Sequence, residues 1–147
     1  MSTGHEEETV PAIGTIFFSS TYDEALALTR EARSYLAGPG QEAVQELSSD
    51  QSFGYATESL RMTTRLTEAM SWLFFQRAVQ AGEITAEEAQ AQDCHLQHAD
   101  ICLPEEIRDI SSLPMGLVSL LIRSEDLYRR ITRLDQMAIH AYERARS

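Results

Sequence analysis

Apolar residues recur at helical spacing over a long uninterrupted stretch, residues 49–82, which contains no proline and one internal glycine, Gly54. Thirty helical residues would extend about 45 Å, so another element is expected to lie alongside them. Ser48 or Ser49 is the expected N-cap, and Gly82 is a suitable residue to end the helix. The apolar face is predicted to comprise Leu60, Leu66, Met70, Leu73 and Phe74, with Ala56, Thr63 and Ala69 between them.

A second long pattern begins near Pro114 and ends at about Arg144. Its apolar positions alternate steps of three and four residues, as in a heptad repeat, and therefore predict a long helix with one buried face. That face could pack inside a bundle or against a second copy of the chain. Its members are Leu117, Leu120, Ser124, Leu127, Ile131, Leu134, Ala138 and Ala141.

A shorter helix is predicted at the beginning of the chain. Thr21 and Glu24 have the spacing of a capping box, so the helix is expected to begin at Ser20 or Thr21. Gly38-Pro39-Gly40 should end it. Residues 1–15 are expected to form a flexible acidic tail, with residues 16–18 as an apolar clasp against the bundle. The expected buried face is Ala25, Leu28, Ala32 and Tyr35.

Together these patterns predict an all-α protein. The expected architecture is a three-helix bundle with two long antiparallel helices, 49–82 and 114–144, and one shorter helix. Short helical turns are expected in the connections, including one capped by Thr85 and Glu88. No stretch has the alternation of a strand, and residues 16–145 are predicted to form a single domain.

The charge of the chain limits its partners. The net charge is −11, which argues against general affinity for nucleic acid or anionic lipid. The basic residues gather in the two long helical patterns and the acidic ones elsewhere, and all twelve cations are arginines. No apolar run suggests a membrane span, and the first ten residues lack the layout of a secretion signal, so a cytoplasmic protein is expected.

Four residues that could bind a metal are close together: Cys94, His95, His98 and Cys102. On a helix, Cys94, His98 and Cys102 would share one face. Structural zinc sites usually combine two separated ligand pairs, however, so an ordinary acidic linker is the preferred interpretation. The alternative function is a metal- or thiol-dependent sensor or small enzyme. Because acidic neighbours disfavour a thiolate and no cofactor motif occurs, neither an enzyme nor a cofactor is expected.

Two groups of arginines are the remaining candidates for a functional site. Arg61 and Arg65 lie one turn apart in the first long pattern, and Arg129, Arg130 and Arg133 lie together in the last. They could form ion pairs with the acidic connections, or they could bind an acidic protein partner, since arginine is frequent at binding hot spots. Trp72, the single tryptophan, is expected in the core.

Two blocks of sequence carry a family resemblance. The first, Ser59 to Thr85, contains S-x-R-x-T-x-R-L followed by S-W-L-x-x-Q-R-A-V-x-x-G-E-I-T. The second, Ser124 to Asp135, reads S-x-x-L-Y-x-R-I-x-R-L-D. With residues 24–40, they resemble the RcdA family, regulators of CtrA degradation in alphaproteobacteria.

The resemblance implies a cytoplasmic helical bundle that forms a homodimer and does no covalent chemistry. It implies an adaptor that connects the ClpXP protease to cell-cycle substrates and to further adaptors. The expected partner-binding residues are Arg61, Arg65, Gln76, Arg129, Arg130 and Arg133.

Overall fold

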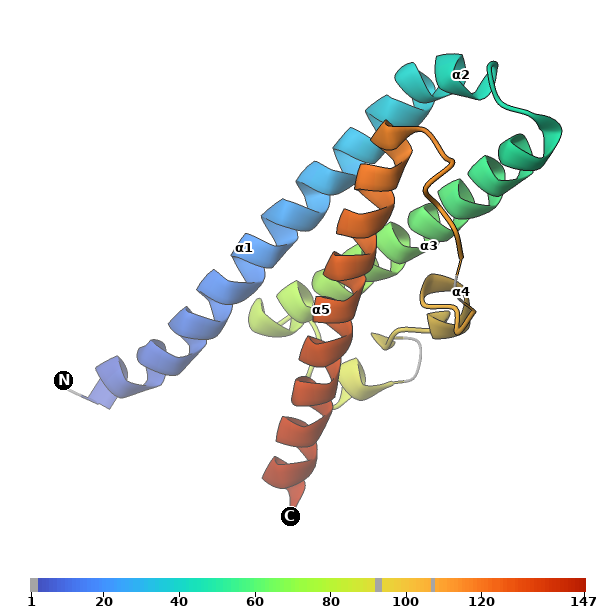
Figure 1. Cartoon of the computed structure of the whole chain (residues 1–147). Helices are drawn as coiled ribbons and strands as arrows, with labels where there is room; N and C mark the ends of the chain where they lie inside the picture. Colours follow the sequence, from blue (N-terminus) through green and yellow to red (C-terminus); the bar gives the residue numbers. More distant parts are fainter. Residues whose placement is uncertain (1–2, 92–93, 107) are drawn as a thin grey trace.

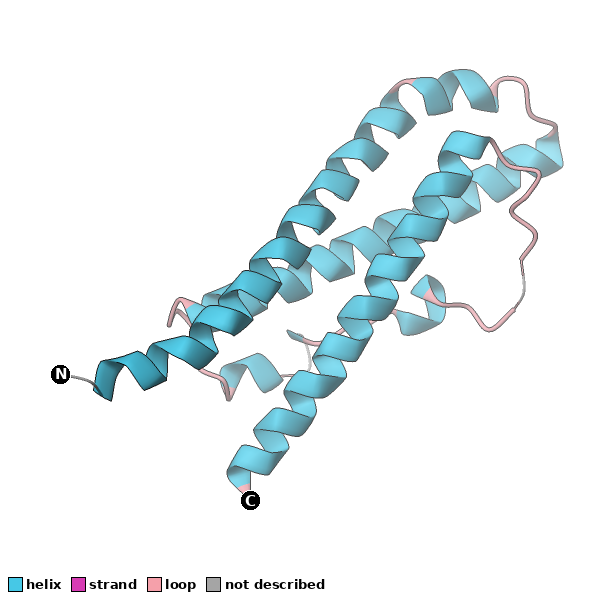
Figure 2. Ribbon diagram, turned by 60° about the vertical axis from the view of Figure 1, so that its left-hand side comes forward, coloured by secondary structure: helices cyan, strands magenta, loops and turns pink. Residues whose placement is uncertain are grey.

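Three long helices pack side by side, and two short helical segments connect the second of them to the third (Figures 1 and 2). The computed structural model describes residues 3–91, 94–106 and 108–147, and the side chains of these from Ser19 onward. This part of the chain contains no strand, which confirms the predicted all-α bundle. The helices are α1 (Thr3–Ala37), α2 (Pro39–Val44), α3 (Ser49–Gln80), η1 (Glu88–Gln90), α4 (Ala99–Cys102) and α5 (Met115–Arg146).

The buried face of α5 follows the predicted repeat. The first five residues of the predicted apolar face are buried, because steps of three and four residues keep them on the side of α5 that faces α1 and α3. Leu134 and Ala138 are partly buried, and Ala141 is exposed near the end of the helix. The five buried members are Leu117, Leu120, Ser124, Leu127 and Ile131.

The ends of α3 also follow the sequence, but its buried face does not. Ser48 and Gln51 form a capping box at the start, and Gly82 has a positive φ of 76° after the end. Leu60 and Phe74 were predicted to be buried, and this is wrong: they are 68% and 54% exposed. The buried face instead includes two charged residues: its members are Tyr55, Glu58, Met62, Arg65, Leu66, Ala69, Trp72 and Leu73.

The first helix begins much earlier than its capping box suggested. α1 extends from Thr3, so Thr21 lies inside the helix and the predicted start at Ser20 or Thr21 is wrong. Ala25, Leu28 and Ala32 are buried as predicted. The side chains of the predicted clasp, residues 16–18, lie outside the described part. The flexibility of residues 1–15 and the domain boundary at 16–145 stay predictions.

The directions of the long helices differ from the expected arrangement. α1 is antiparallel to both α3 and α5, whereas α3 and α5 run in the same direction (Figure 1). Two hydrogen bonds between α3 and α5 show the same direction, because the later residue of α3 bonds to the later residue of α5: Arg65 bonds to Ser124, and Trp72 bonds to Asp135. The pair 49–82 and 114–144 is therefore parallel rather than antiparallel. The three helices also have similar lengths of 35, 32 and 32 residues.

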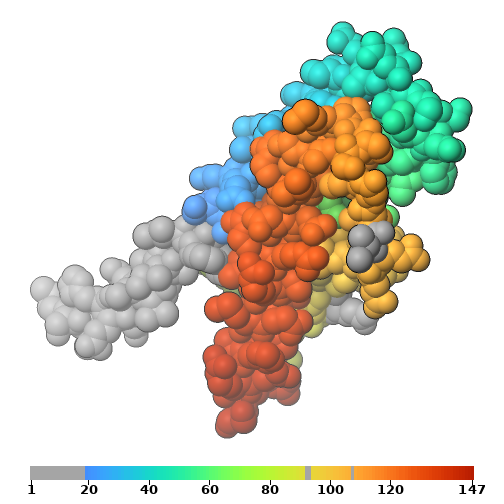
Figure 3. All heavy atoms as spheres, viewed as in Figure 1, coloured from blue at the N-terminus to red at the C-terminus, as the bar shows by residue number. Residues whose placement is uncertain are grey.

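Parallel packing requires the chain to return to the end where it started, and residues 81–114, here called the crossover segment, make that return. This segment contains η1 and α4 and lies against α3. Thr85 and Glu88 form the two reciprocal hydrogen bonds of the predicted capping box in the turn that leads into η1. In Figure 3, α5 occupies the near face of the molecule, with α1 on one side and the crossover segment on the other.

Candidate functional site

Arg65, predicted at the sequence level to be a partner-binding residue, lies in the interior of the bundle. Only 1% of it is exposed. Its Nε donates to the Cys102 carbonyl at 2.8 Å, and its Nη1 donates to the Leu121 carbonyl and to Ser124 Oγ, each at 3.2 Å. Its Nη2 lies 3.3 Å from Glu125 Oε1. One guanidinium therefore connects α3, α4 and α5.

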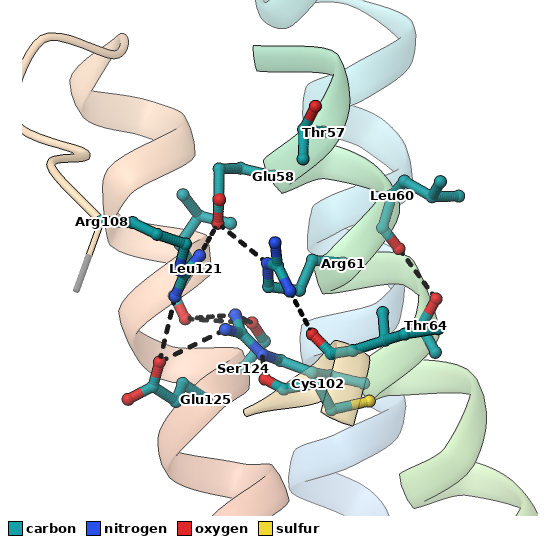
Figure 4. A network of polar contacts seen from close by, with 12 residues as sticks. Thr57, Glu58, Leu60, Arg61, Thr64, Cys102, Arg108, Leu121, Ser124 and Glu125 are labelled. Carbon is teal, nitrogen blue, oxygen red and sulfur yellow. Dashed lines mark hydrogen bonds and ion pairs between the residues drawn. The ribbon is translucent and has the colours of Figure 1, made fainter. Parts of the chain in front are cut away.

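A second layer of charges surrounds Arg65. Glu58, about two helical turns before it on α3, forms ion pairs with Arg61 and with Arg108 of the crossover segment. Arg61 donates to the Ile101 carbonyl, and Arg108 also lies 3.7 Å from Glu125. Figure 4 shows these side chains converging from α3, α5 and the crossover segment. The acids thus offset cations whose burial would otherwise be costly.

This network changes the interpretation of the arginines on α3. Burial lowers the pKa of Arg65, and the neighbouring Glu125 opposes that shift. All its contacts are internal, so it presents no surface to a partner. The Arg61 side chain is 14% exposed and already bonded to the crossover segment. Both residues are therefore better explained as structural ties, and sequence reasoning missed the acid Glu58 that balances them.

The arginines of α5 are placed differently. Arg129 is exposed and has one weak contact, 3.4 Å from Glu125 Oε2 one turn away. Arg133, on the same face one turn later, is exposed and makes no ion pair with any described residue. Arg130 points to α1 and pairs with Glu24, and it also contacts Asp126. Arg129 and Arg133 therefore form the accessible part of the predicted cluster.

Gln76 lies near the C-terminal end of α3 and is partly buried. Its neighbour Arg77 is exposed and stacks over the ring of Tyr22, with 4.5 Å between the guanidinium carbon and the ring centre. The same tyrosine contacts Phe74 edge to face, with ring centres 5.8 Å apart. This end of α3 is thus tied to α1 by aromatic contacts.

Of the four candidate metal ligands, Cys94, His95 and His98 line one pocket beside α3, but their contacts go to different groups. His95 is within 2.9 Å of Asp135 Oδ1 through one ring nitrogen and 3.1 Å of the Gln90 carbonyl through the other. His98 lies near Glu68 instead, with its backbone amide donating to that carboxylate at 2.9 Å. No group of three potential ligands with metal-binding geometry occurs among the described residues.

Cys102 has no catalytic setting either. Cys102 is fully buried beside Tyr128, and burial raises the pKa of its thiol to about 11. Burial likewise raises the pKa of Tyr128. A thiol in this state is mostly protonated near neutral pH and is a poor nucleophile. The geometry therefore offers no support for the alternative of a thiol-dependent sensor or enzyme.

Asp135, the last residue of the second family block, is a buried acid that was not among the predicted site residues. Its Oδ1 accepts a hydrogen bond from Trp72 Nε1 at 2.9 Å and contacts His95 at the same distance. It therefore joins α3, α5 and the crossover segment, as Arg65 does at the other end of the interface. Trp72 is 1% exposed, which confirms its predicted place in the core.

Comparisons with known proteins place the chain in a family. A family described as "Protein of unknown function (DUF1465)" matches residues 11–147. The crystal structure of RcdA from Caulobacter crescentus CB15 is similar, with a TM-score of 0.68 and 40% sequence identity. That similarity covers 82% of this chain and 89% of the other. A comparison with curated proteins found no match. Within the described part of the chain, no helix is long and apolar enough to cross a membrane.

Proposed function

The chain belongs to the RcdA family, and on this premise we propose that it is a non-enzymatic protein-interaction module. Its proposed role is that of an adaptor that helps deliver cell-cycle regulatory substrates to the ClpXP protease. The observation that carries the proposal is the 40% identity to RcdA over most of both chains. The partners would be the protease complex, a substrate or a further adaptor.

The candidate site supports a binding role more than a chemical one. The titratable groups inside the bundle hold its elements together: Arg65 and Asp135 each connect two long helices and the crossover segment. The thiol with the most sheltered position, Cys102, is held in its protonated form by burial. What the described surface offers is a set of exposed side chains on long, rigid helices, which suits recognition of another protein.

The proposed contact for an acidic partner is the exposed pair Arg129 and Arg133 on α5. Both are exposed on one helix face, and among the described residues the one acid that either of them pairs with is Glu125. A planar guanidinium binds carboxylates with two parallel hydrogen bonds, so two of them one turn apart suit an acidic segment. The homodimer and the cytoplasmic location implied by the family remain part of this proposal.

A reconstituted degradation assay tests the role. Purified ClpXP, a candidate cell-cycle substrate and any required further adaptor are incubated with and without this chain, and substrate half-life is measured. We expect faster degradation with the chain present. Absence of any association with the protease complex, the substrate or an adaptor, together with unchanged half-lives in cells lacking the chain, would contradict the proposal.

A charge-reversal variant tests the proposed contact. Arg129→Glu with Arg133→Glu should weaken binding of the acidic partner while leaving the unfolding midpoint nearly unchanged, because both side chains are exposed. The matched control is Arg144→Glu with Arg146→Glu, which makes the same change of charge at the exposed end of α5. Equal loss of binding in both variants would indicate net charge rather than a local contact.

A further inference from the structure

The three helices of the bundle form three outer grooves, and two of these are already occupied. The groove between α1 and α5 is crossed by two-pronged ion pairs, Arg123 with Glu31 and Arg130 with Glu24. The side of α3 and α5 is covered by the crossover segment, which is tied down by Arg65 and Asp135. No described residue bridges or covers the groove between α1 and α3 in this way.

This α1/α3 groove has a volume of about 700 Å³ and is lined mostly by apolar groups. On α3 it extends from Thr63 to Phe74, which is roughly 16 Å of helix. None of its eleven lining residues makes a hydrogen bond or an ion pair to the opposite helix. Phe74 is 54% exposed, so a large apolar surface remains in contact with water.

The threonines of the groove add to its apolar character. Thr29, Thr63 and Thr67 each donate their hydroxyl to the carbonyl four residues earlier in their own helix, at 2.7–2.9 Å. Because each hydroxyl already donates its hydrogen bond within its own helix, these side chains do not need a hydrogen-bond acceptor from a ligand. A partner in this groove is therefore recognised through apolar contact rather than through hydrogen bonds to these residues.

The charged part of the groove lining is positive. Arg33 is its single charged lining residue, and no lining residue is acidic, although the whole chain carries a net charge of −11. Arg33 is exposed and forms no ion pair with any described residue. An unpaired guanidinium at the side of an apolar groove favours a ligand that brings its own carboxylate.

We propose that the α1/α3 groove binds an amphipathic helix of a partner protein, with apolar residues at i, i+3/i+4 and i+7 and an acidic residue facing Arg33. Two antiparallel helices with an open groove between them accept a third helix in the same way that they accept α5 on the opposite side. The inference rests on the proposed function only in taking a protein segment as the occupant.

A second copy of the chain fits this groove less well. A two-fold dimer through it would place two acid-free grooves against each other, each with its own Arg33. Such an interface would supply no carboxylate to either arginine. The charge of the groove therefore favours a different, acidic partner.

Binding of designed peptides to the full-length chain tests the proposal. Two fluorescein-labelled amphipathic peptides of roughly 18 residues, five helical turns, share one leucine stripe. They differ in carrying either two Glu or two Lys beside that stripe, and binding is followed by fluorescence anisotropy. Because the chain is strongly acidic, non-specific attraction would favour the Lys peptide. We expect the Glu peptide to bind about tenfold more tightly instead, through Arg33.

Three single variants locate the site. Arg33→Glu should reverse the preference between the peptides, and Thr67→Glu, an exposed change inside the groove, should weaken binding of the Glu peptide by about tenfold or more. Ile122→Glu is the matched control, since it adds the same charge at a 59% exposed position in the α1/α5 groove and should leave binding unchanged. Circular dichroism would verify that each variant is folded.

Three results would overturn the inference: no binding of the Glu peptide, a preference for the Lys peptide, or binding that Thr67→Glu leaves unchanged. Sedimentation equilibrium adds a fourth, because a dimer that Thr67→Glu dissociates would mean that a second copy occupies the groove. The assay uses this chain alone, so a negative result leaves the degradation assay unaffected, and failure in the degradation assay leaves the peptide result standing.

Discussion

Replacing Arg65 by methionine tests whether this buried arginine holds the crossover segment in place. Methionine retains most of the apolar stem and removes the guanidinium. Buried ion pairs can often be replaced by apolar residues without loss, because the pair costs desolvation energy. Here most acceptors are backbone or helix groups that remain after the substitution, namely the Cys102 and Leu121 carbonyls and Ser124 Oγ. The loss of stability in Arg65→Met should therefore come from buried acceptors that are left without a hydrogen-bond donor.

The magnitude follows from which acceptors find other partners. Ser124 Oγ is already bonded to the Leu121 carbonyl at 3.1 Å, and Glu125 has a side chain 35% exposed, so water can replace part of what it loses. The Cys102 carbonyl loses its 2.8 Å bond to a charged donor. A hydrogen bond to a charged group contributes about 1.5–3 kcal/mol, so we expect Arg65→Met to cost about 2–4 kcal/mol. The stability of Arg65→Lys should lie between those of the parent chain and Arg65→Met, because an ammonium group cannot make all the hydrogen bonds of a planar guanidinium.

Urea unfolding followed by circular dichroism gives the free energy of unfolding. Hydrogen exchange measured alongside it should show faster exchange of backbone amides in residues 99–106 than in the rest of the chain. Arg33→Met is the matched control, because that arginine is exposed and unpaired, and its stability should be unchanged. The reasoning is refuted if Arg65→Met is as stable as the parent chain, or if exchange rises uniformly instead of in this segment.

Four further predictions concern packing, two glycines and the thiols. Leu127→Ala, at a position with no exposed surface in the α5 seam, should lower the free energy of unfolding by about 2–5 kcal/mol, as measured in urea. Gly54→Ala should raise it by about 0.5–1 kcal/mol, since the nearest atom to the new Cβ is 3.8 Å away. Gly40→Ala should lower the free energy of unfolding, because the new Cβ would clash with the hydroxyl of Tyr55. Iodoacetamide at pH 8 should modify the half-buried Cys94 and spare Cys102 until urea unfolds the chain, since burial raises the pKa of Cys102 to about 11; equal modification rates in the folded protein would contradict this.

The sequence predicts those faces that contain only apolar residues. On α5 the regular steps of three and four place Leu117, Leu127 and Ile131 in the core, because an apolar face has one way to avoid water. On α3 the same reasoning fails. Its buried face includes Glu58 and Arg65, which no apolar pattern selects, and consequently Leu60 and Phe74 were assigned to the wrong side.

The burial of Glu58 and Arg65 depends on groups far away in the sequence. Arg65 bonds to residues 37 to 60 positions later, and Glu58 pairs with Arg108, 50 positions later. The direction of α5 depends on the same segment: only the crossover allows α3 and α5 to run parallel, and residues 93–112 have no periodic pattern that would reveal its path. The all-α bundle was therefore predictable, but the arrangement of its long helices and the role of the α3 arginines were not.

The absence of lysine acquires a structural meaning at particular positions. Codon bias could explain it in general, but Arg65 uses three nitrogens to reach four acceptors, and Arg123 binds both oxygens of Glu31 at 2.8 and 2.7 Å. Lysine has a single charged nitrogen and cannot reproduce either arrangement. Arg33 has the same planar guanidinium, and no acid among the described residues pairs with it. Arginines whose guanidinium groups are bonded within the bundle hold its helices together, whereas exposed arginines without an ion pair are available to a partner. Residue type alone does not make this distinction.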